Sequence, residues 1–249
     1  MKVNILFPVL DEERRLEKGI LKTLLFLKKN KLFDYQLTII DNGSTDATAA
    51  ISRRLCEKHP EVHYLKTPER GVGVALRTGA ADNRCEVIGY MDIDLSTNIE
   101  HLRQVKDIFE NQPDAKIIKG SRLMKNSTVM GRKPAREFTS RGLNRLLHVV
   151  FKNQFTDALC GFDFYRKETF DDLIAASSQD NGWFYCVELL LRAERQGIAV
   201  HDIPVIWEDD YDTKVKVIKT VVSYLKQIKF LKSEFIKEDR QKNKLKNLN

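Results

Sequence analysis

Short apolar runs alternate with amphipathic stretches along the first 120 residues of the chain. The apolar runs are rich in β-branched side chains, which is typical of buried strands. The stretches between them repeat apolar residues every three or four positions, as at Leu16, Ile20, Leu24 and Leu27, which is typical of helices. Strands are predicted at 3–9, 35–41, 62–67, 86–94 and 115–121, and helices at 12–30, 46–58, 71–83 and 99–111. This alternation predicts an α/β, Rossmann-like fold with a mainly parallel sheet and flanking helices.

The pattern changes after residue 121. Residues 124–141 are polar and basic and show no strand signal. Further helices are predicted at 142–151 and 183–197, the second ended by Gly197, and short strands within 157–170 and at 198–207. We expect these pieces to complete the sheet and to wall off one side of it.

The C-terminal segment 214–249 differs from the rest in charge. It carries a net charge of +8, whereas the whole chain carries +7, so residues 1–213 are near neutral. A neutral body argues against a protein whose whole face binds nucleic acid. We predict a domain at 1–213 and a basic amphipathic C-terminal helix and tail at 214–249, with one apolar stripe formed by Ile218, Val221, Leu225, Ile228, Leu231 and Phe235. This helix would lie on an anionic membrane surface or pack within the protein or an oligomer, and both interpretations stay open.

Composition limits the class of protein. A chain of 249 residues with 42% hydrophobic residues suits one large α/β domain with an appendage. No apolar run reaches the roughly 18–20 residues that span a bilayer, and the N-terminus does not fit a signal peptide. The four cysteines form no CxxC pair, which favours a reduced compartment without structural zinc. We therefore expect a cytoplasmic protein, peripheral at the cytoplasmic face of a membrane.

Two carboxylates mark the end of the strand predicted at 86–94. Asp92 and Asp94 are two residues apart, so on a strand both side chains leave by one face. A hard divalent cation, Mg²⁺ or Mn²⁺, would relieve their repulsion and bridge them to a diphosphate, and Ser96 could add an oxygen. The alternative is that Asp94 caps a turn and Asp92 pairs with a lysine.

Other predicted strand ends also carry polar groups, and ligands of parallel sheets bind beyond such ends. Asp41 could accept a hydrogen bond from a nucleoside, whereas residues 42–46 fit a turn and helix cap. Pro8 is expected to stop pairing at the end of the first strand. Glu12 lies at the start of the next helix, where an acidic residue also stabilises the helix N-terminus without any ligand. Gly71 permits close approach of a phosphate or sugar. The glycines do not form a dinucleotide fingerprint after the first strand.

Basic residues follow the fifth predicted strand. Each alone fits a solvated surface, but as a group they would form an anion-binding rim, since arginine binds phosphate at two points. The group comprises Arg122, Arg132, Lys133, Arg136 and Arg141.

Together, these segments resemble the inverting nucleotide-sugar glycosyltransferases of family 2, which have the GT-A fold. The resemblance runs from about residue 3 to 217 and is strongest to the branch that makes polyprenyl-phosphate (dolichyl-phosphate) glucose or mannose. It rests on the order and spacing of the segments FPVLDEERRL, IIDNGSTDAT, RGVGVALRTG, YMDIDLS, GSRL, DALCGFDFYRKETF, CVELLLRAERQG and IPVIWEDDYDTKV.

The resemblance implies a role for each matching residue. Pro8, Glu12 and Asp41 would bind the nucleoside, and Asp92 would contact the donor. Asp94 and Ser96 would hold Mg²⁺ or Mn²⁺. The acceptor phosphate would be bound by Arg122, Arg136 and Ser140, and the donor phosphates by Lys214. Asp157 is a candidate helper, assigned by the neighbouring CGF motif alone.

Several residues depart from the family pattern. Asp11 replaces the usual Asn, Glu69 and Val72 stand where Asn and Lys are usual, and Cys186 stands where Asp is often found. Glu208 stands where the mannosyl enzymes carry Arg. The resemblance therefore favours UDP-glucose as the donor, with GDP-mannose as the alternative.

The implied reaction is a single displacement in which the acceptor phosphate attacks the anomeric carbon. A phosphate monoester is largely a dianion at pH 7, so it needs no strong general base. Three rival interpretations stay open. They are a family 2 transferase acting on a sugar hydroxyl, a haloacid-dehalogenase-like phosphatase using DIDLS, and a nucleotide-binding module without catalysis. The sequence leaves the oligomeric state open.

Overall fold

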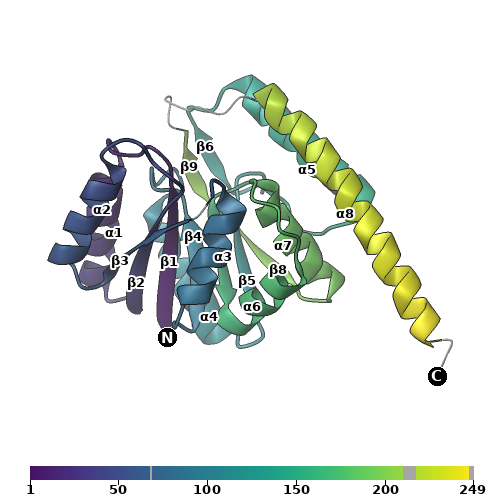
Figure 1. Ribbon diagram of the computed structural model, residues 1–249, viewed down its shortest axis with the longest axis horizontal. Helices are drawn as coiled ribbons and strands as arrows, with labels where there is room; N and C mark the ends of the chain where they lie inside the picture. The colour runs from purple at the N-terminus through teal and green to yellow at the C-terminus, as the bar shows by residue number, and fades with distance from the viewer. Residues whose placement is uncertain (68, 210–216, 247–249) are drawn as a thin grey trace. The chain divides into compact units, whose positions relative to one another are not determined.

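The computed structural model describes residues 1–67, 69–209 and 217–246 (Figure 1). The chain forms two compact units. The first comprises residues 1–132 and 155–210, and the second comprises 133–154 and 211–249. The predicted domain boundary between residues 213 and 214 lies outside the described residues.

A seven-stranded sheet forms the centre of the first unit, with strand order β3-β2-β1-β4-β7-β5-β8. β7 is antiparallel to both of its neighbours, and the other adjacent pairs are parallel. The prediction of an α/β fold with a mainly parallel sheet is therefore confirmed. The strands of this sheet are β1 (Lys2–Val9), β2 (Asp34–Asp41), β3 (Val62–Lys66), β4 (Val87–Met91), β5 (Ile117–Ser121), β7 (Phe162–Arg166) and β8 (Val200–Pro204).

Helices cover both faces of the sheet. Figure 1 shows α3, α6 and α7 together on the face toward the viewer. On the other face, buried side chains of α1 and α4 join the main apolar cluster of β1, β4 and β7. Since β1 and β4 are covered on both faces, their sequences are mostly apolar, whereas β7 carries the buried Asp163. The helices of this unit are α1 (Leu16–Asn30), α2 (Thr48–Lys58), α3 (Val72–Asp82), the short 3₁₀ helix η1 (Ile99–His101), α4 (Leu102–Asn111), α6 (Lys167–Ala176) and α7 (Phe184–Arg195).

A second sheet has two strands, one of which lies in the segment where no strand was predicted. β6 (Thr128–Met130) pairs in parallel with β9 (Ile206–Glu208). The prediction of no strand between 124 and 141 was therefore wrong. The pairing joins segments more than 70 residues apart, so the local pattern carries no sign of it. The single strand predicted at 198–207 is divided between β8 and β9.

Two helix starts predicted in the first unit were misplaced. The helix predicted from residue 12 begins at Leu16, because a turn closed by the carbonyl of Glu12 precedes it. The helix predicted from residue 46 begins at Thr48 and has no side-chain cap. Ser44 and Thr45, the expected caps, are instead engaged with the loops of Asp41 and Asp11.

The second unit pairs α5 (Pro134–Phe151) with α8 (Val217–Lys246). Pro134 begins α5, eight residues before the predicted start, at a position where its missing N–H costs nothing. The rings of Phe151 and Phe235 meet edge-on, with centroids 5.8 Å apart. Among the described residues, no helix is long and apolar enough to cross a membrane.

The buried stripe of α8 differs from the predicted one at one position. Leu225, predicted within the stripe, is 48% exposed, and Tyr224 is buried instead. The described buried residues of the stripe are Tyr224, Ile228, Leu231 and Phe235, while Ile218 and Val221 lie among side chains outside the described set.

Candidate functional site at the carboxyl ends of the strands

The carboxyl ends of β2, β1 and β4 lie side by side, because these strands are neighbours in the sheet. β1 pairs with β2 up to Val9↔Asp41, but its pairing with β4 ends at Leu6↔Tyr90. Pro8 thus lies where β1 has a strand neighbour on one side only. The strand ends at Val9, as predicted, but its pairing with β2 continues past Pro8, where the proline was expected to stop it.

Asp41 ends β2 and is fully buried. Its Oδ1 accepts the Ser44 amide at 2.7 Å, and its Oδ2 accepts the Tyr64 hydroxyl at 2.9 Å. Burial opposes ionisation of this carboxyl, but these hydrogen bonds outweigh it and lower the pKa of Asp41 below its ordinary value. Asp41 is therefore an ionised, fixed acceptor whose contacts also form a turn.

Residues 11–13 connect the loops that follow β1 and β2. Asp11 has φ 54°, a left-handed conformation that Asp and Asn tolerate best, and its Oδ1 accepts the Thr45 amide at 2.7 Å. The Asn expected here from the resemblance would tolerate the same conformation. The amide of Glu12 donates to Thr48 Oγ1 at 2.9 Å, and the half-buried Glu12 carboxylate lies 3.5 Å from Arg15.

Gly71 precedes α3 with φ 141°, which only glycine adopts readily. A Cβ at this position would lie 1.9 Å from the carbonyl oxygen of Asn181. That carbonyl also accepts the Gly73 amide at 3.1 Å. The close approach at Gly71 is thus made by the chain's own loop between α6 and α7.

Asp92 and Asp94 lie in the turn that follows β4, since the strand ends at Met91. The prediction that both stand on the strand itself was wrong. The turn closes from the Leu95 amide to the Asp92 carbonyl, and Leu95 takes a left-handed φ of 54°. The Ser96 amide donates to Asp94 Oδ1 at 2.9 Å. This turn keeps Asp94 exposed and Asp92 half-buried.

The two carboxylates of this turn repel each other. Burial, and after it the negative charge of Asp94, raises the pKa of Asp92 to about 7. Arg122 and Lys119 are the positive charges that act against this rise. Such a pair is a suitable site for a cation, because a cation would remove the repulsion.

Gly161 makes room for Asp92. A Cβ on Gly161 would lie 2.1 Å from Oδ2 of Asp92, and the Gly161 carbonyl accepts the Asp92 amide at 3.4 Å. Sequence reasoning noted the CGF motif but missed this residue. The signal was available, since a glycine directly before a strand often marks a close approach.

Arg122 and Asp157 form a buried two-point ion pair. Nε and Nη2 of Arg122 donate to Oδ2 and Oδ1 of Asp157 at 2.7 and 3.0 Å. Burial opposes both charges, but Arg122 holds the pKa of Asp157 well below its usual range. The guanidinium also lies over the Trp207 ring, 4.7 Å from its centroid. Asp157 therefore fixes Arg122, and it is not poised to take up a proton.

The other two residues predicted to bind the acceptor phosphate lie in the second unit, and Lys214 was predicted to bind the donor phosphates. Arg136 and Ser140 are one helical turn apart on α5, and Ser140 is buried. Arg141 on the same helix pairs with Glu137 at 2.5 Å. Lys214 lies outside the described residues. The predicted anion-binding rim is thus divided between the two units.

The residues of the Asp92–Ser96 turn fit a hard divalent cation, as judged from their donor atoms. They offer carboxylate and hydroxyl oxygens, and Gly161 leaves space at the Asp92 carboxylate. Within the described ranges, no group of three or more His, Cys, Asp or Glu could hold a metal ion. A cation here would therefore need further oxygens from a bound phosphate, as Mg²⁺ commonly does.

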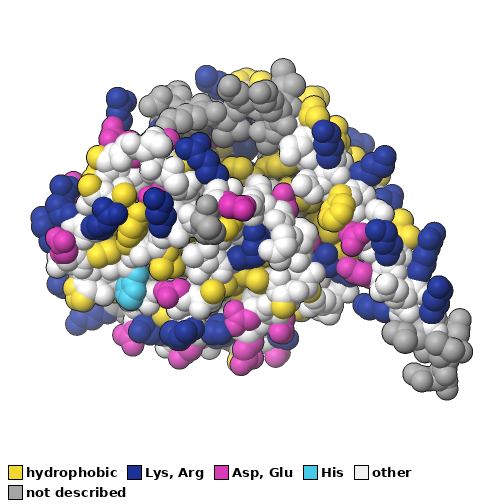
Figure 2. Space-filling view, viewed as in Figure 1, with side chains coloured by type: hydrophobic (Ala, Val, Ile, Leu, Met, Phe, Trp, Pro, Cys, Tyr) yellow, Lys and Arg dark blue, Asp and Glu magenta, His cyan; other side chains and the backbone are white. Residues whose placement is uncertain are grey.

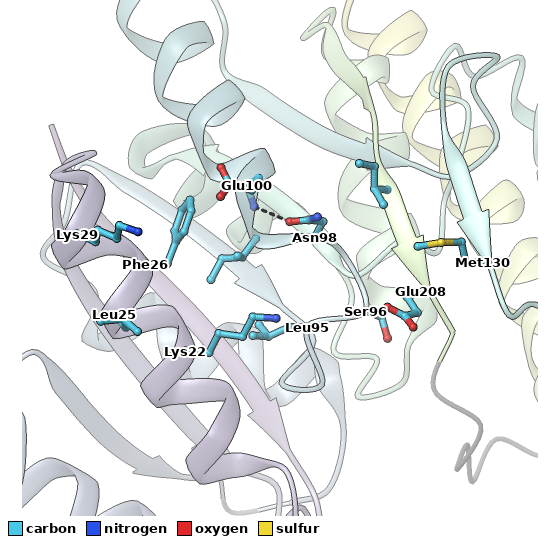
Figure 3. A pocket seen from close by; sticks show the side chains of 12 residues that line it. Lys22, Leu25, Phe26, Lys29, Leu95, Ser96, Asn98, Glu100, Met130 and Glu208 are labelled. Carbon is cyan, nitrogen blue, oxygen red and sulfur yellow. Dashed lines mark hydrogen bonds between the residues drawn. The ribbon is translucent and has the colours of Figure 1, made fainter.

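An open cavity of about 460 Å³ lies beside this turn, between α1 and β9 (Figure 3). Figure 3 shows Lys22, Leu25 and Phe26 of α1 on one side and Met130 and Glu208 on the other. Of the predicted site residues, Ser96 alone lines this cavity. The cavity therefore adjoins the site at Ser96 and is not formed by the predicted donor-binding residues.

The family model and the relatives that match this chain are all glycosyltransferases. A family model described as "Glycosyl transferase family 2" matches residues 5–174. The chain is 30% identical over 231 residues to glycosyltransferase AglD of Haloferax volcanii, covering 92% of this chain and 36% of that protein. It is 27% identical over 224 residues to a dolichyl-phosphate beta-glucosyltransferase of Trichomonas vaginalis, covering 86% and 68%. The chain thus spans about a third of the first relative and about two thirds of the second.

A solved structure shares the fold. Glucosyl-3-phosphoglycerate synthase from Mycobacterium tuberculosis, in complex with Mn²⁺ and uridine-diphosphate-glucose, matches with a TM-score of 0.67. The match covers 91% of this chain and 78% of that one at 15% sequence identity. At this identity the likeness concerns the fold alone, and the expected GT-A fold is confirmed.

Proposed function

Since the chain belongs to glycosyl transferase family 2, we propose that it transfers a hexose from a nucleotide-sugar to a polyprenyl or dolichyl phosphate. Relatives named dolichyl-phosphate beta-glucosyltransferase, from Trichomonas vaginalis and Dictyostelium discoideum, support this acceptor and favour glucose as the sugar. UDP-glucose is therefore the favoured donor and GDP-mannose the alternative.

One structural observation carries the proposal. The acidic turn of Asp92 and Asp94 and the guanidinium of Arg122 belong to the same compact unit, and the charges of Asp92 and Arg122 act on each other. Acidic oxygens suit a donor diphosphate with its cation, whereas a fixed guanidinium suits an acceptor phosphate. A donor and a phosphate nucleophile could thus meet at this place.

In the proposed mechanism, an acceptor phosphate oxygen forms a bond to the anomeric carbon while the bond to the donor diphosphate breaks. The configuration is inverted. Arg122 would orient the acceptor phosphate, since Asp157 holds its Nε and Nη2 and leaves Nη1 free of that pair. Asp92 would face the donor, and Asp41 would accept a hydrogen bond from the nucleoside. The rate would come from positioning and charge stabilisation.

A divalent cation would be held by Asp94 and Ser96. When bound, Mg²⁺ or Mn²⁺ would stabilise the charge that develops on the leaving diphosphate. The solved structural neighbour in complex with Mn²⁺ and UDP-glucose supports the use of a divalent metal.

The state of Asp157 makes it unsuitable as the general base that a sugar-hydroxyl acceptor would need. The ion pair with Arg122 holds the pKa of Asp157 well below its usual range. A phosphate dianion needs no such base.

The basic helix α8 would bring the protein to its lipid substrate. Figure 2 shows basic side chains along α8. The described exposed side chains of this helix include six lysines and four large apolar residues. They are Lys226, Lys229, Lys232, Lys237, Lys242 and Lys244, and Val222, Leu225, Phe230 and Ile236. This combination suits the surface of an anionic membrane.

A panel of donors and acceptors tests the proposal. UDP-glucose, GDP-mannose and UDP-N-acetylglucosamine would each be incubated with a short polyprenyl phosphate and Mn²⁺ or Mg²⁺, and the products identified by mass spectrometry. We expect glycosylated lipid phosphate from UDP-glucose. Transfer to a sugar hydroxyl alone, or no turnover of any donor, would overturn the proposal.

A further inference from the structure

The central sheet contains a buried ion pair, between Lys119 and Asp163, that the proposed mechanism does not use. Lys119 on β5 stands directly opposite Asp163 on the antiparallel neighbour β7. Both side chains are fully buried, and Nζ of Lys119 lies 2.6 Å from Oδ1 of Asp163. Fully buried lysine and aspartate are rare unless they are paired. The pair is also costly to form, since two charges must leave water.

Stability alone does not explain this pair. Apolar residues of similar volume often replace a buried ion pair with equal or greater stability. Burial opposes the charge on Lys119, but Asp163 outweighs it and raises the pKa of the ammonium, so Lys119 stays charged. We therefore look for a role of the charged Lys119 side chain other than stabilising the fold.

The second hydrogen-bond partner of Lys119 indicates such a role. Its Nζ donates to the backbone carbonyl of Cys160, which also accepts the Phe162 amide at 2.9 Å. Cys160 precedes β7 and belongs to the segment 157–161. The ammonium therefore connects this segment to β5 at a point inside the protein.

The two ends of the segment 157–161 contact the residues proposed for the acceptor and for the donor. At one end, Asp157 fixes Arg122, the residue proposed for the acceptor phosphate. At the other end, Gly161 lies against Asp92, the residue proposed for the donor. Between them, the Leu159 amide donates to Asp157 at 3.1 Å, which makes the segment a tight turn. A shift of this segment would move Arg122 and Asp92 relative to each other.

We propose that Lys119 is a positioning residue, which fixes the segment 157–161 through the Cys160 carbonyl and so sets the distance between Arg122 and Asp92. Asp163 keeps the ammonium charged and directed at that carbonyl. The consequence for catalysis rests on the function proposed above, whereas the placement of Arg122 does not.

The test uses a double variant in the full-length protein, Lys119→Met with Asp163→Leu. Lys119→Met alone would leave the Asp163 carboxylate buried without its partner, which is strongly destabilising. The double variant removes both charges, but it also leaves the Cys160 carbonyl without the ammonium and the buried hydroxyls of Tyr90 and Tyr165 without the Asp163 carboxylate. We therefore expect a lower melting temperature than that of the wild type, but a smaller loss than in Lys119→Met alone. We expect its kcat/KM for polyprenyl phosphate to fall on the order of 10- to 100-fold, as for a misplaced reacting group.

A spectroscopic readout follows Arg122 without any substrate. Trp207, on whose ring Arg122 lies, is one of only two tryptophans in the chain. In a Trp183→Phe background, the double variant should shift the emission maximum of Trp207. Leu173→Ala, a fully buried α6 residue outside the apolar cluster that contains Trp207, is the control for lost stability. It should lower the melting temperature and leave both the emission and KM unchanged.

A second variant, Lys119→Gln with Asp163→Asn, keeps a donor for the Cys160 carbonyl. It should be more active than the Met/Leu variant but less active than the wild type, because a neutral amide donates a weaker hydrogen bond than an ammonium. It therefore also serves if the Met/Leu variant does not fold. Wild-type kcat/KM and an unshifted Trp207 emission in either folded double variant would overturn the proposal. If the wild-type protein transfers nothing to a lipid phosphate, the proposed function fails, and the emission still decides whether Lys119 positions Arg122.

Discussion

The guanidinium of Arg122 and the carboxylate of Asp157 form a two-point ion pair, with N–O distances of 2.7 and 3.0 Å. The guanidinium lies over the ring of Trp207. The carboxylate is fully buried and the guanidinium nearly so. Arg122 therefore keeps one orientation before any ligand arrives. Such preorganisation reduces the entropy that a bound phosphate must lose.

Removal of the Asp157 carboxylate should impair both stability and activity. Asp157→Ala leaves the buried Arg122 without its partner, which costs about 3–5 kcal/mol of unfolding free energy. Urea unfolding would measure this loss. The double variant Arg122→Met with Asp157→Leu should regain most of the stability but no activity. If the double variant is as active as the wild type, Arg122 has no role in binding the acceptor.

Gly161→Ala should weaken donor binding. The new Cβ would lie 2.1 Å from Asp92 Oδ2, so the carboxylate must leave its position. We expect at least a tenfold weaker affinity for UDP with Mn²⁺, which is about 1.4 kcal/mol, measured by titration calorimetry. Gly142→Ala is the matched control, because a Cβ there meets nothing within 4 Å. An unchanged UDP affinity in Gly161→Ala would show that Asp92 does not need this space.

Gly71→Ala distinguishes two roles of the turn before α3. If Gly71 serves the approach of the chain's own loop, the variant should be destabilised without any ligand, because its Cβ meets the Asn181 carbonyl at 1.9 Å. We expect a lower melting temperature and faster hydrogen exchange in residues 178–182 and at the start of α3. A ligand-free protein of wild-type stability would instead support the sequence-based prediction that the glycine serves a bound phosphate or sugar.

Charge reversal on α8 should reduce membrane binding. Each lysine near an anionic surface contributes about 1 kcal/mol, so replacing Lys226, Lys229 and Lys232 by Glu should release the protein from anionic vesicles. Flotation with phosphatidylserine vesicles would measure this, and vesicles of neutral lipid are the control. Equal flotation of variant and wild type would assign α8 to packing within the protein or an oligomer.

The sequence predicts most of the fold because the strand–helix period is local. The apolar runs and the helical spacing around Leu16 to Leu27 are visible without tertiary information. The antiparallel insertion of β7 between β4 and β5 and the pairing of β6 with β9 are not. Both join segments distant in the chain, and no local pattern encodes them.

The site was predicted only in part, because only some of its residues leave a local signal in the sequence. The acidic strand ends stand out as polar residues after apolar runs, so Asp41, Asp92 and Asp94 could be named. The pairing of Asp157 with Arg122 and the contact of Gly161 with Asp92 depend on where β7 lies in the sheet. Lys119 did leave a local signal, as a lysine within the apolar run at 115–121, but its partner Asp163 could not be identified from the pattern.

The central claim is that the Asp92–Ser96 turn serves metal-dependent transfer to a lipid phosphate. The most direct measurement is the transfer of labelled glucose from UDP-glucose into a polyprenyl phosphate extracted in organic solvent, for the wild type and Asp94→Ala, with Mn²⁺ or with EDTA. Asp94→Ala removes an exposed side chain, so the variant should stay folded. We predict label in the lipid for the wild type with Mn²⁺, and a loss of at least 100-fold with EDTA or in the variant, as on removal of a transition-state contact. Full activity of Asp94→Ala would contradict the account.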